Sequence, residues 1–201
     1  MMTSRQDLKL AMLKKLRPLP IKHEWKYWHV SDESSNWEDT LKEIAMVNTV
    51  QLFWQVFNNL PLNIPIKNSI HFFKNNVKPL WEDPRNEKGG CWNFRLPKSA
   101  APDFFREILM LLIGEQLQDV VLKGDDICGC SYSMRFNSTI ISVWNRDASN
   151  QVSVQNIFNR INDTIPSELW PTAVFYKPHS HHTAFKADQG ASNPSSTAGT
   201  S

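Results

Sequence analysis

The chain has 201 residues, 41% hydrophobic and 21% charged, with a formal net charge of +2 at pH 7. This composition is typical of one globular domain and excludes the broad polycationic surface of proteins that bind duplex nucleic acid. Three cysteines argue against a disulfide framework and for a reducing compartment. Because no apolar run approaches the roughly 18 residues of a membrane span, and the start lacks a secretory pattern, we expect neither a membrane span nor secretion.

Residues 1–20 are expected to form a flexible arm ahead of the folded domain. Apolar residues recur at every fourth position from Leu8 to Leu16 among several lysines, which is typical of a short amphipathic helix. A mitochondrial presequence would show a similar pattern, but Asp7 counts against that alternative. The prolines that follow end any helix, so the domain is expected to begin at residue 21.

The first predicted strand covers residues 24–30. Its alternation places Trp25, Tyr27 and His29 on one face, and Trp28 and Val30 on the other. The polar segment that follows is expected to be a loop, and Trp37 lies at its end. A Trp at the tip of a polar loop has no local apolar neighbours to bury it, so Trp37 is a candidate stacking platform.

Residues 48–59 predict a helix, with Asn48 at its N-cap and Gln51 as the capping-box partner. Its core face is expected to consist of Phe53, Val56, Phe57 and Leu60. Val50 and Trp54 form a ridge beside that face. Trp54 either widens the buried stripe or is exposed as an anchor for a partner helix, and the pattern favours neither.

The stretch 78–84 places Trp81 and Glu82 side by side between Pro79 and Pro84. Proline fixes φ and lacks an amide donor, so a loop is expected here. An aromatic face beside a two-oxygen acceptor suits a flat, cationic ligand with two donors on one edge, such as a charged purine. The alternative is a Trp that packs on the core beside a solvated Glu, and this stretch alone leaves it open.

The remaining pattern predicts an α+β domain over residues 21–185, with an antiparallel sheet, helices on one face, and solvent or ligand on the other. Gly89 and Gly90 are expected to form a hairpin turn. Strands are predicted at residues 69–73, 91–96, 127–136, 139–146 and 171–177. A helix is predicted at residues 102–117, and its core stripe is expected to consist of Phe105, Ile108, Leu109 and Leu112. A further amphipathic helix is predicted around Val154, Ile157, Phe158 and Ile161. Residues 186–201 have almost nothing to bury, so a disordered tail is expected.

Metal or catalytic chemistry has little support in the sequence. Cys128 and Cys130 are predicted to share a strand face, and the nearest further ligands are His179, His181 and His182. Their spacing does not supply four ligands, so we expect neither a metal nor another cofactor. Nucleophile elbows, phosphate loops and paired catalytic carboxylates do not stand out, so we expect no enzyme.

Several motifs occur in one order: Trp37 on its loop, the run from Thr49 to Trp54, the run from Pro79 to Asp83, Gly89-Gly90 before Trp92, the run from Leu112 to Glu115, Cys128-Gly129, and Trp144 after Arg135. In these motifs, over residues 17–184, the chain resembles the eukaryotic translation initiation factor 4E family, which binds the messenger-RNA cap. The resemblance implies a curved, mostly antiparallel sheet of about eight strands. Three helices would cover its convex face, and the cap would lie in its concave face.

The resemblance also implies which residues bind the 7-methylguanosine cap. Trp37 and Trp81 would sandwich the positively charged base, each face contributing about 1–3 kcal/mol. Glu82 would accept the N1 and N2 hydrogens, and the backbone amide of Trp81 would donate to O6. Trp144 would pack near the N7 methyl group, and Arg135 would contact the phosphates.

On the convex side, the resemblance implies a surface that docks a helical Tyr-x-x-x-x-Leu-hydrophobic motif. This motif occurs in the scaffold initiation factor 4G and in competing regulators. The matching positions are Pro18, Leu19, Val50, Trp54, Arg106 and Met110. Arg106 replaces what is usually Leu. We expect a monomer that acts in the cytoplasm, with the nucleus as a second location, and that recruits the scaffold to capped messenger RNA.

Two positions depart from the family pattern. Cys91 stands where many members carry Arg, and Ile140 where many carry a phosphate-binding Lys. The loss of these cations should weaken triphosphate binding unless other basic groups substitute, the candidates being Lys88, Arg146, Lys177 and the cluster at 179–182. Two alternatives stay open: a cap-binding repressor or divergent cap binder with weakened scaffold binding, and a general module for single strands or nucleotides.

Overall fold

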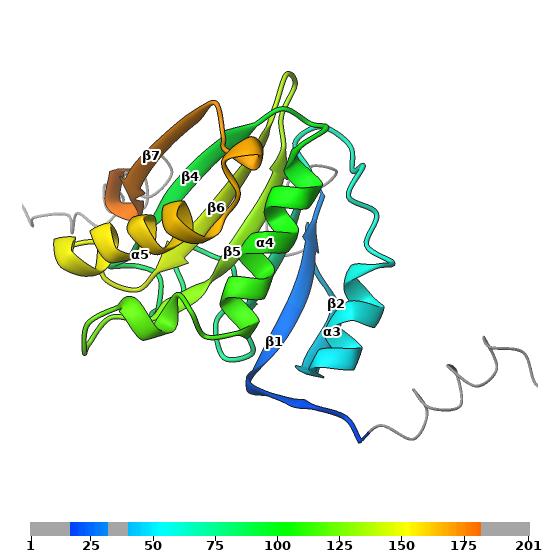
Figure 1. Cartoon of the computed structure of the whole chain (residues 1–201), viewed down its shortest axis with the longest axis horizontal. Helices are drawn as coiled ribbons and strands as arrows, with labels where there is room; N and C mark the ends of the chain where they lie inside the picture. The colour runs from blue at the N-terminus through cyan, green and yellow to red at the C-terminus, as the bar shows by residue number, and fades with distance from the viewer. Residues whose placement is uncertain (1–16, 32–39, 182–201) are drawn as a thin grey trace, which may run out of the picture.

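The strands of this protein form one open antiparallel sheet in a computed structural model that describes residues 17–31 and 40–181 (Figure 1). The described part contains seven strands in the order β2-β1-β3-β5-β6-β4-β7, so the predicted number of about eight was slightly too high. Their bounds are β1 Pro20–Val30, β2 Leu41–Thr49, β3 Ser69–Lys74, β4 Gly90–Leu96, β5 Ile127–Met134, β6 Thr139–Asn145 and β7 Ala173–Pro178. The predicted tail and most of the predicted arm lie outside the described residues.

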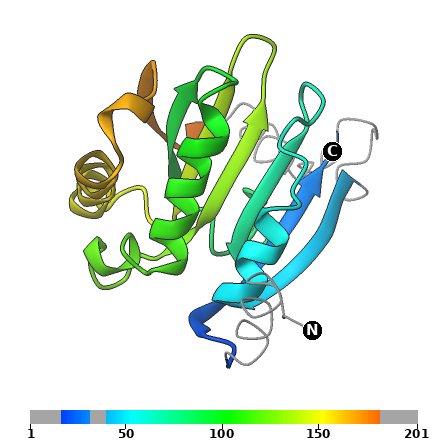
Figure 2. The same cartoon turned by 45° about the vertical axis from the view of Figure 1, so that its right-hand side comes forward.

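The α-helices of the described part are α3 (Val50–Phe57), α4 (Ala101–Ile113) and α5 (Gln151–Thr164). They cover the same face of the curved sheet, as Figures 1 and 2 show from two directions. Short 3-10 helices lie at Gln118–Val120, Ser167–Leu169 and His179–His181. Among the helices described, none has the length and apolar character needed to span a membrane.

The hydrophobic core lies between the helices and the sheet. The predicted stripe of α4, Phe105 to Leu112, is confirmed, since each of its four members is at most 2% exposed. β4 presents Phe94 and Leu96 to the same core, as its alternation predicted. On α3 only Phe53 is fully buried, while the other predicted core residues of that helix are partly exposed. Burial of one such Phe contributes about 1.5–3 kcal/mol.

One strand was missed, and two local predictions were wrong. Strand β2 was not predicted, because it is an edge strand in which only Val47 is fully buried, so it has no hydrophobic alternation. The N-cap of α3 is Thr49, whose hydroxyl accepts from the Leu52 amide at 3.3 Å, and Asn48 lies in β2. Gly89 and Gly90 form no hairpin, because β4 pairs with β6 and β7.

The two glycines instead permit close packing. A Cβ at Gly89 would lie 2.1 Å from the Asn145 carbonyl oxygen, and a Cβ at Gly90 would lie 2.4 Å from the Tyr176 hydroxyl. Any larger residue would therefore push β4 away from its neighbours.

Cys128 and Cys130 do not share a face, contrary to the prediction. The pairing of β5 with β6 shifts between Ile127 and Gly129, so a β-bulge adds one residue and reverses the alternation. Cys130 packs in the main core, while Cys128 packs with Phe73 and Trp144 in a smaller cluster. Among the residues described, no group of three or more His, Cys, Asp or Glu side chains could hold a metal ion.

Candidate functional site

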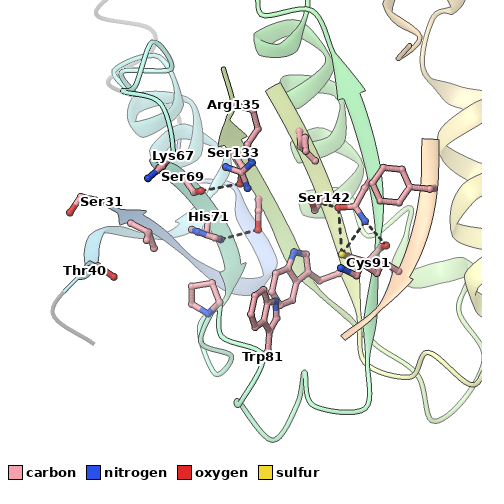
Figure 3. Close-up of a pocket in the computed structure, with 18 residues that line it drawn as sticks. Ser31, Thr40, Lys67, Ser69, His71, Trp81, Cys91, Ser133, Arg135 and Ser142 are labelled. Carbon is pink, nitrogen blue, oxygen red and sulfur yellow. Dashed lines mark hydrogen bonds between the residues drawn. The ribbon is translucent and has the colours of Figure 1, made fainter. Parts of the chain in front are cut away.

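The face of the sheet opposite the helices holds a cavity of about 490 Å³ (Figure 3). Strand register sets its layout in cross-strand rows. One row contains Trp144, Cys91 and Lys177, and the next contains Ser142, Asn93 and Phe175. All six of these residues line the cavity, so β6, β4 and β7 form one wall.

One end of the cavity is aromatic. Trp81 and Trp144 both line it, and Trp144 is only 6% exposed. Phe73 contacts Trp144 nearly edge-on, with ring centroids 5.2 Å apart, and the ring of His179 lies 4.4 Å from that of Trp144. The buried Nε1–H of Trp144 has no hydrogen-bond acceptor among the described residues. The end therefore offers two indole surfaces, one of them firmly held.

Hydrogen bonds clamp the loop that carries Trp81. The Asp83 carboxylate accepts from the backbone amides of Lys78 and Arg85, both at 2.9 Å. Asn86, fully buried, donates from Nδ2 to the carbonyl oxygens of Lys78 and Leu80 at 2.8 and 2.7 Å. The sequence reasoning missed these clamp residues, although Asn and Asp in a Pro-rich loop are the usual signal for such bonds.

Glu82 is placed differently from Trp81. Glu82 is exposed and does not line the cavity, although its neighbour Trp81 does. Trp37 lies outside the described residues. Of the predicted cap-binding residues, the structure therefore brings three to the cavity: Trp81, Trp144 and Arg135.

The floor of the cavity is polar and neutral. Ser69 and Ser133 share a hydrogen bond of 2.9 Å between their hydroxyls, and His71 Nδ1 lies 2.8 Å from the Ser131 hydroxyl. Burial, and then the electrostatic influence of His29 and Arg135, lower the pKa of His71 to about 3, so the ring is neutral near pH 7. The sequence reasoning missed this floor, although Ser131 and Ser133 alternate along β5.

The opposite end of the cavity is cationic, with Lys67 and Arg135 beside Ser69 and Ser133 in Figure 3, away from Trp81. Burial, and then nearby Arg95, lower the pKa of Arg135. Lys177 also lines the cavity, whereas no Asp or Glu does among the residues described. A lining whose described residues include three cations and no carboxylate is suited to a polyanion. Lys67 was missed by the sequence reasoning.

The two departures from the family pattern, Cys91 and Ile140, both line this cavity. Burial raises the pKa of the Cys91 thiol to about 12, so the thiol is neutral. Of the four basic groups considered as substitutes, Lys177 lines the cavity, Lys88 and Arg146 do not, and the 179–182 cluster extends beyond the described residues.

The predicted partner residues gather on the convex side. Leu19 is 59% exposed, and its backbone amide and carbonyl bond to Gln51 Oε1 and the Val50 amide, both at 2.9 Å. These bonds hold the segment with Pro18 against the start of α3. Trp54 is half-buried, with its ring packed on Phe53 and Phe57.

Arg106 and Met110 contribute to this side from α4, and both are partly exposed. Arg106 forms ion pairs with Asp103 and Glu107, at 2.8 and 3.2 Å. Phe57 of α3 lies 6.5 Å from Phe105 of α4, ring to ring, so the two helices are packed side by side.

Comparison with known protein families gives one family match. The model described as "Eukaryotic initiation factor 4E" matches residues 20–194. Among curated proteins, the translation initiation factor NCBP of rice is 35% identical, over 80% of this chain and 71% of that protein. The factor 4E1 of Drosophila melanogaster is 33% identical, over 73% of this chain and 57% of that protein.

Solved structures of related proteins have the same fold. The C. elegans eIF4E-3 structure with the 4E-binding protein Mextli and a cap analog matches with a TM-score of 0.74 and 28% identity, over 84% of this chain and 96% of that one. Ascaris suum eIF4E-3 with an m7G cap matches with a TM-score of 0.68 and 28% identity, over 83% and 94% of the respective chains.

Proposed function

The chain belongs to the eukaryotic initiation factor 4E family, and we propose that it binds the 7-methylguanosine cap of messenger RNA and recruits a scaffold factor for translation initiation. The observation that carries this proposal is the cavity, with indole rings at one end and cations at the other, and with no Asp or Glu among the described residues that line it. A capped message carries the complementary groups in the same order. Its cationic base suits the indole rings, and the phosphate chain that follows suits the cations.

In this proposal Trp81 stacks on the methylated base, and Trp144 packs near its methyl group. Methylation at N7 gives the base a positive charge, and an indole face attracts a cation by about 0.5–2 kcal/mol. Trp37 supplies the second stacking face, and Glu82 accepts the N1 and N2 hydrogens of guanine. Glu82 is exposed beside Trp81, so its carboxylate is accessible to the edge of a base that stacks on that ring. Arg135 contacts the phosphates.

The first prediction tests base recognition. We expect 7-methylguanosine triphosphate to quench the Trp fluorescence and to bind at least tenfold more tightly than GTP, a difference of about 1.4 kcal/mol or more. The physical reason is that GTP has the same phosphates but lacks the positive charge on the base. Equal affinity for the two nucleotides would rule out cap recognition and favour a general nucleotide-binding module.

The partner proposal concerns the convex side. Val50, Trp54 and Met110, with Pro18 and Leu19 beside them, form a ridge that suits an amphipathic helix with the Tyr-x-x-x-x-Leu-hydrophobic motif. We propose that this helix belongs to the scaffold factor 4G or to a regulator that shares its motif. The protein then acts as a non-enzymatic adaptor in the cytoplasm.

Arg106 supports a second candidate function, a cap-binding repressor with weakened scaffold binding. A partner helix that buries this guanidinium would remove its solvent and disturb its pairs with Asp103 and Glu107. Titration of a scaffold peptide distinguishes the two functions, since a repressor should bind it far more weakly than it binds the cap.

A further inference from the structure

A second cavity, of about 570 Å³, lies at the end of the sheet where β1 begins, β3 ends and β5 begins. It shares no described lining residue with the cavity on the concave face. Every described residue that lines it is polar or charged, and the lining includes two lysines and an arginine: Lys22, Lys74 and Arg85. The proposed cap site and partner ridge use none of these residues, so the cavity is a separate candidate site.

Lys74 is the most buried of these three cations. Its side chain is only 8% exposed, although the residue lines the cavity. Its ammonium group donates to Asp126 Oδ1 at 2.5 Å and to Gln118 Oε1 at 3.0 Å. An ammonium group has three N–H donors, so one N–H has no oxygen or nitrogen acceptor among the described residues. A ligand in the cavity can supply that acceptor.

Arg85 contributes a second cation, from the loop that carries Trp81. Its Nη1 lies 3.8 Å from Asp126 Oδ2, so Lys74 and Arg85 share one carboxylate. The side chain of Asn76, which carries no charge, accepts from both terminal nitrogens of Arg85 at 3.2 Å when its oxygen is turned toward the guanidinium. Two cations beside one carboxylate leave a surplus positive charge at this wall of the cavity.

The other carboxylates near the cavity do not saturate its donors. Lys22 Nζ lies 3.8 Å from Glu115 Oε2, an ion pair without a hydrogen bond. Glu24 accepts from the side-chain amide of Asn75 at 3.0 Å. Because Asp126 is already engaged by two cations, the described lining has more free N–H donors than free acceptors. The complementary ligand is an oxyanion.

We propose that this cavity binds a phosphate monoester, whose oxygens accept from Lys74, Arg85 and Lys22. A phosphate monoester carries a charge of about −1.5 to −2 near pH 7 and three strong acceptor oxygens, so it can use all three cations at once. Among the described residues, the imidazole of His23 is the only ring in the lining. A nucleobase would therefore lack a stacking platform, which argues against a nucleic acid as the source of the phosphate.

Two sources can supply this group: a small phosphate monoester in solution, or a phosphorylated side chain of a bound partner. The partner ridge lies within reach, since Leu19 on the ridge precedes Lys22 by three residues. In an extended chain this separation is about 10 Å. The second source rests on the proposed partner binding, whereas the phosphate site itself does not.

The experiment titrates the full chain with inorganic phosphate at constant ionic strength and follows the side-chain amide NMR signals of Asn76 and Gln118. We expect these signals to shift with saturation in the wild type. Arg85→Gln and Lys22→Gln should each weaken this binding by about fivefold or more, and Arg85→Lys should weaken it less than Arg85→Gln. Lys88→Gln, which removes an exposed cation that lines neither cavity, is the matched control and should have no effect.

Several results would overturn the inference. Signals of Asn76 and Gln118 that do not shift would do so, as would equal phosphate affinity in wild type and Arg85→Gln. A loss of affinity in Lys177→Gln but not in Arg85→Gln would place the phosphate in the concave cavity instead. Thermal melting of each variant separates a lost contact from a lost fold. Lys74 is left unchanged because its removal would leave Asp126 without its closest partner.

Peptides distinguish the two sources. They carry the Tyr-x-x-x-x-Leu-hydrophobic motif with or without a phosphoserine in the flanking segment. A phosphopeptide that binds about fivefold more tightly than its unmodified form, with the gain lost in Arg85→Gln, would identify a partner's side chain as the source. Equal binding of the two peptides would identify a small phosphate monoester. None of these measurements involves the cap, so a protein without preference for methylated nucleotides would overturn the proposed function and not this site.

Discussion

A substitution at Glu82 can distinguish the hydrogen bonds that select guanine from the stacking that holds the base. It is exposed and lies outside the cavity in the structure, so its side chain contributes little to the fold. In the proposed complex it pairs with two donors on the guanine edge. A hydrogen bond to a charged group is worth about 1.5–3 kcal/mol, and the donors remain unpaired if the carboxylate is removed.

We therefore predict that Glu82→Ala lowers the affinity for 7-methylguanosine triphosphate by more than tenfold while the melting temperature stays unchanged. Fluorescence titration and thermal melting of the same variant measure the two quantities. Glu87→Ala is the control, since Glu87 is also exposed and lies in the same loop. Retention of full affinity in Glu82→Ala would show that another group reads the guanine edge.

His71 gives a prediction about pH. Its folded-state pKa is lowered to about 3, mainly by burial, whereas a His in the unfolded chain titrates near its usual value of about 6.5. Between these values the unfolded state binds one proton that the folded state does not. This residue therefore destabilises the fold as the pH decreases below about 6.5, by at most about 1.4 kcal/mol per pH unit.

Denaturant unfolding of wild type and His71→Asn at pH 7 and pH 5 tests this effect. The variant, which retains a donor for Ser131, should lose less stability between the two pH values than wild type does. Identical losses would mean that the ring is protonated in the folded protein, contrary to its burial.

On helix α3, Trp54 is half-buried. We therefore expect its substitution to affect partner binding more than it affects the stability of the fold. A fully buried Trp→Ala change costs about 3–5 kcal/mol, so we expect Trp54→Ala to cost less than that and to leave the domain folded. It should weaken the binding of a peptide with the Tyr-x-x-x-x-Leu-hydrophobic motif by about 2 kcal/mol or more, since a Trp with part of its ring accessible is a typical hot spot. Thermal melting and peptide titration check both parts.

Helix α4 provides the companion variant. Arg106→Leu removes ion pairs that are partly exposed and contribute little stability. A gain in peptide affinity would show that Arg106 weakens the interface and would favour the repressor function. An unfolded Trp54→Ala protein, or one that binds the peptide normally, would place the partner surface elsewhere.

At the level of the whole molecule, the sheet separates the two proposed binding surfaces. The cavity lies on the concave face, while α3 and α4, which carry the proposed partner ridge, cover the other face (Figures 1 and 2). The cap should therefore stabilise Trp54→Ala as much as it stabilises wild type, by about 2.7 kcal/mol at a free concentration of 100 times Kd. Loss of this stabilisation would indicate that the two faces are coupled through the core.

The sequence by itself determined the elements that have a strong local pattern. The α4 stripe follows from apolar residues spaced at the helical period, and the faces of β4 follow from strict alternation. The Trp81-Glu82 loop follows from its prolines, which exclude a helix. The family resemblance rests on the same local motifs, because each motif is a short run whose chemistry can be read without knowing its neighbours in space.

Only the tertiary structure decided which residues lie side by side across strands. β2 has too little buried surface to show alternation, and the bulge in β5 reverses the face of Cys130 by adding a single residue. The serine floor, the asparagine clamp under Trp81 and the pairing of Arg95 with Ile140 join positions distant in sequence. Such neighbours depend on strand order and register, which are set by the packing of the whole sheet, and no local pattern in the chain specifies them.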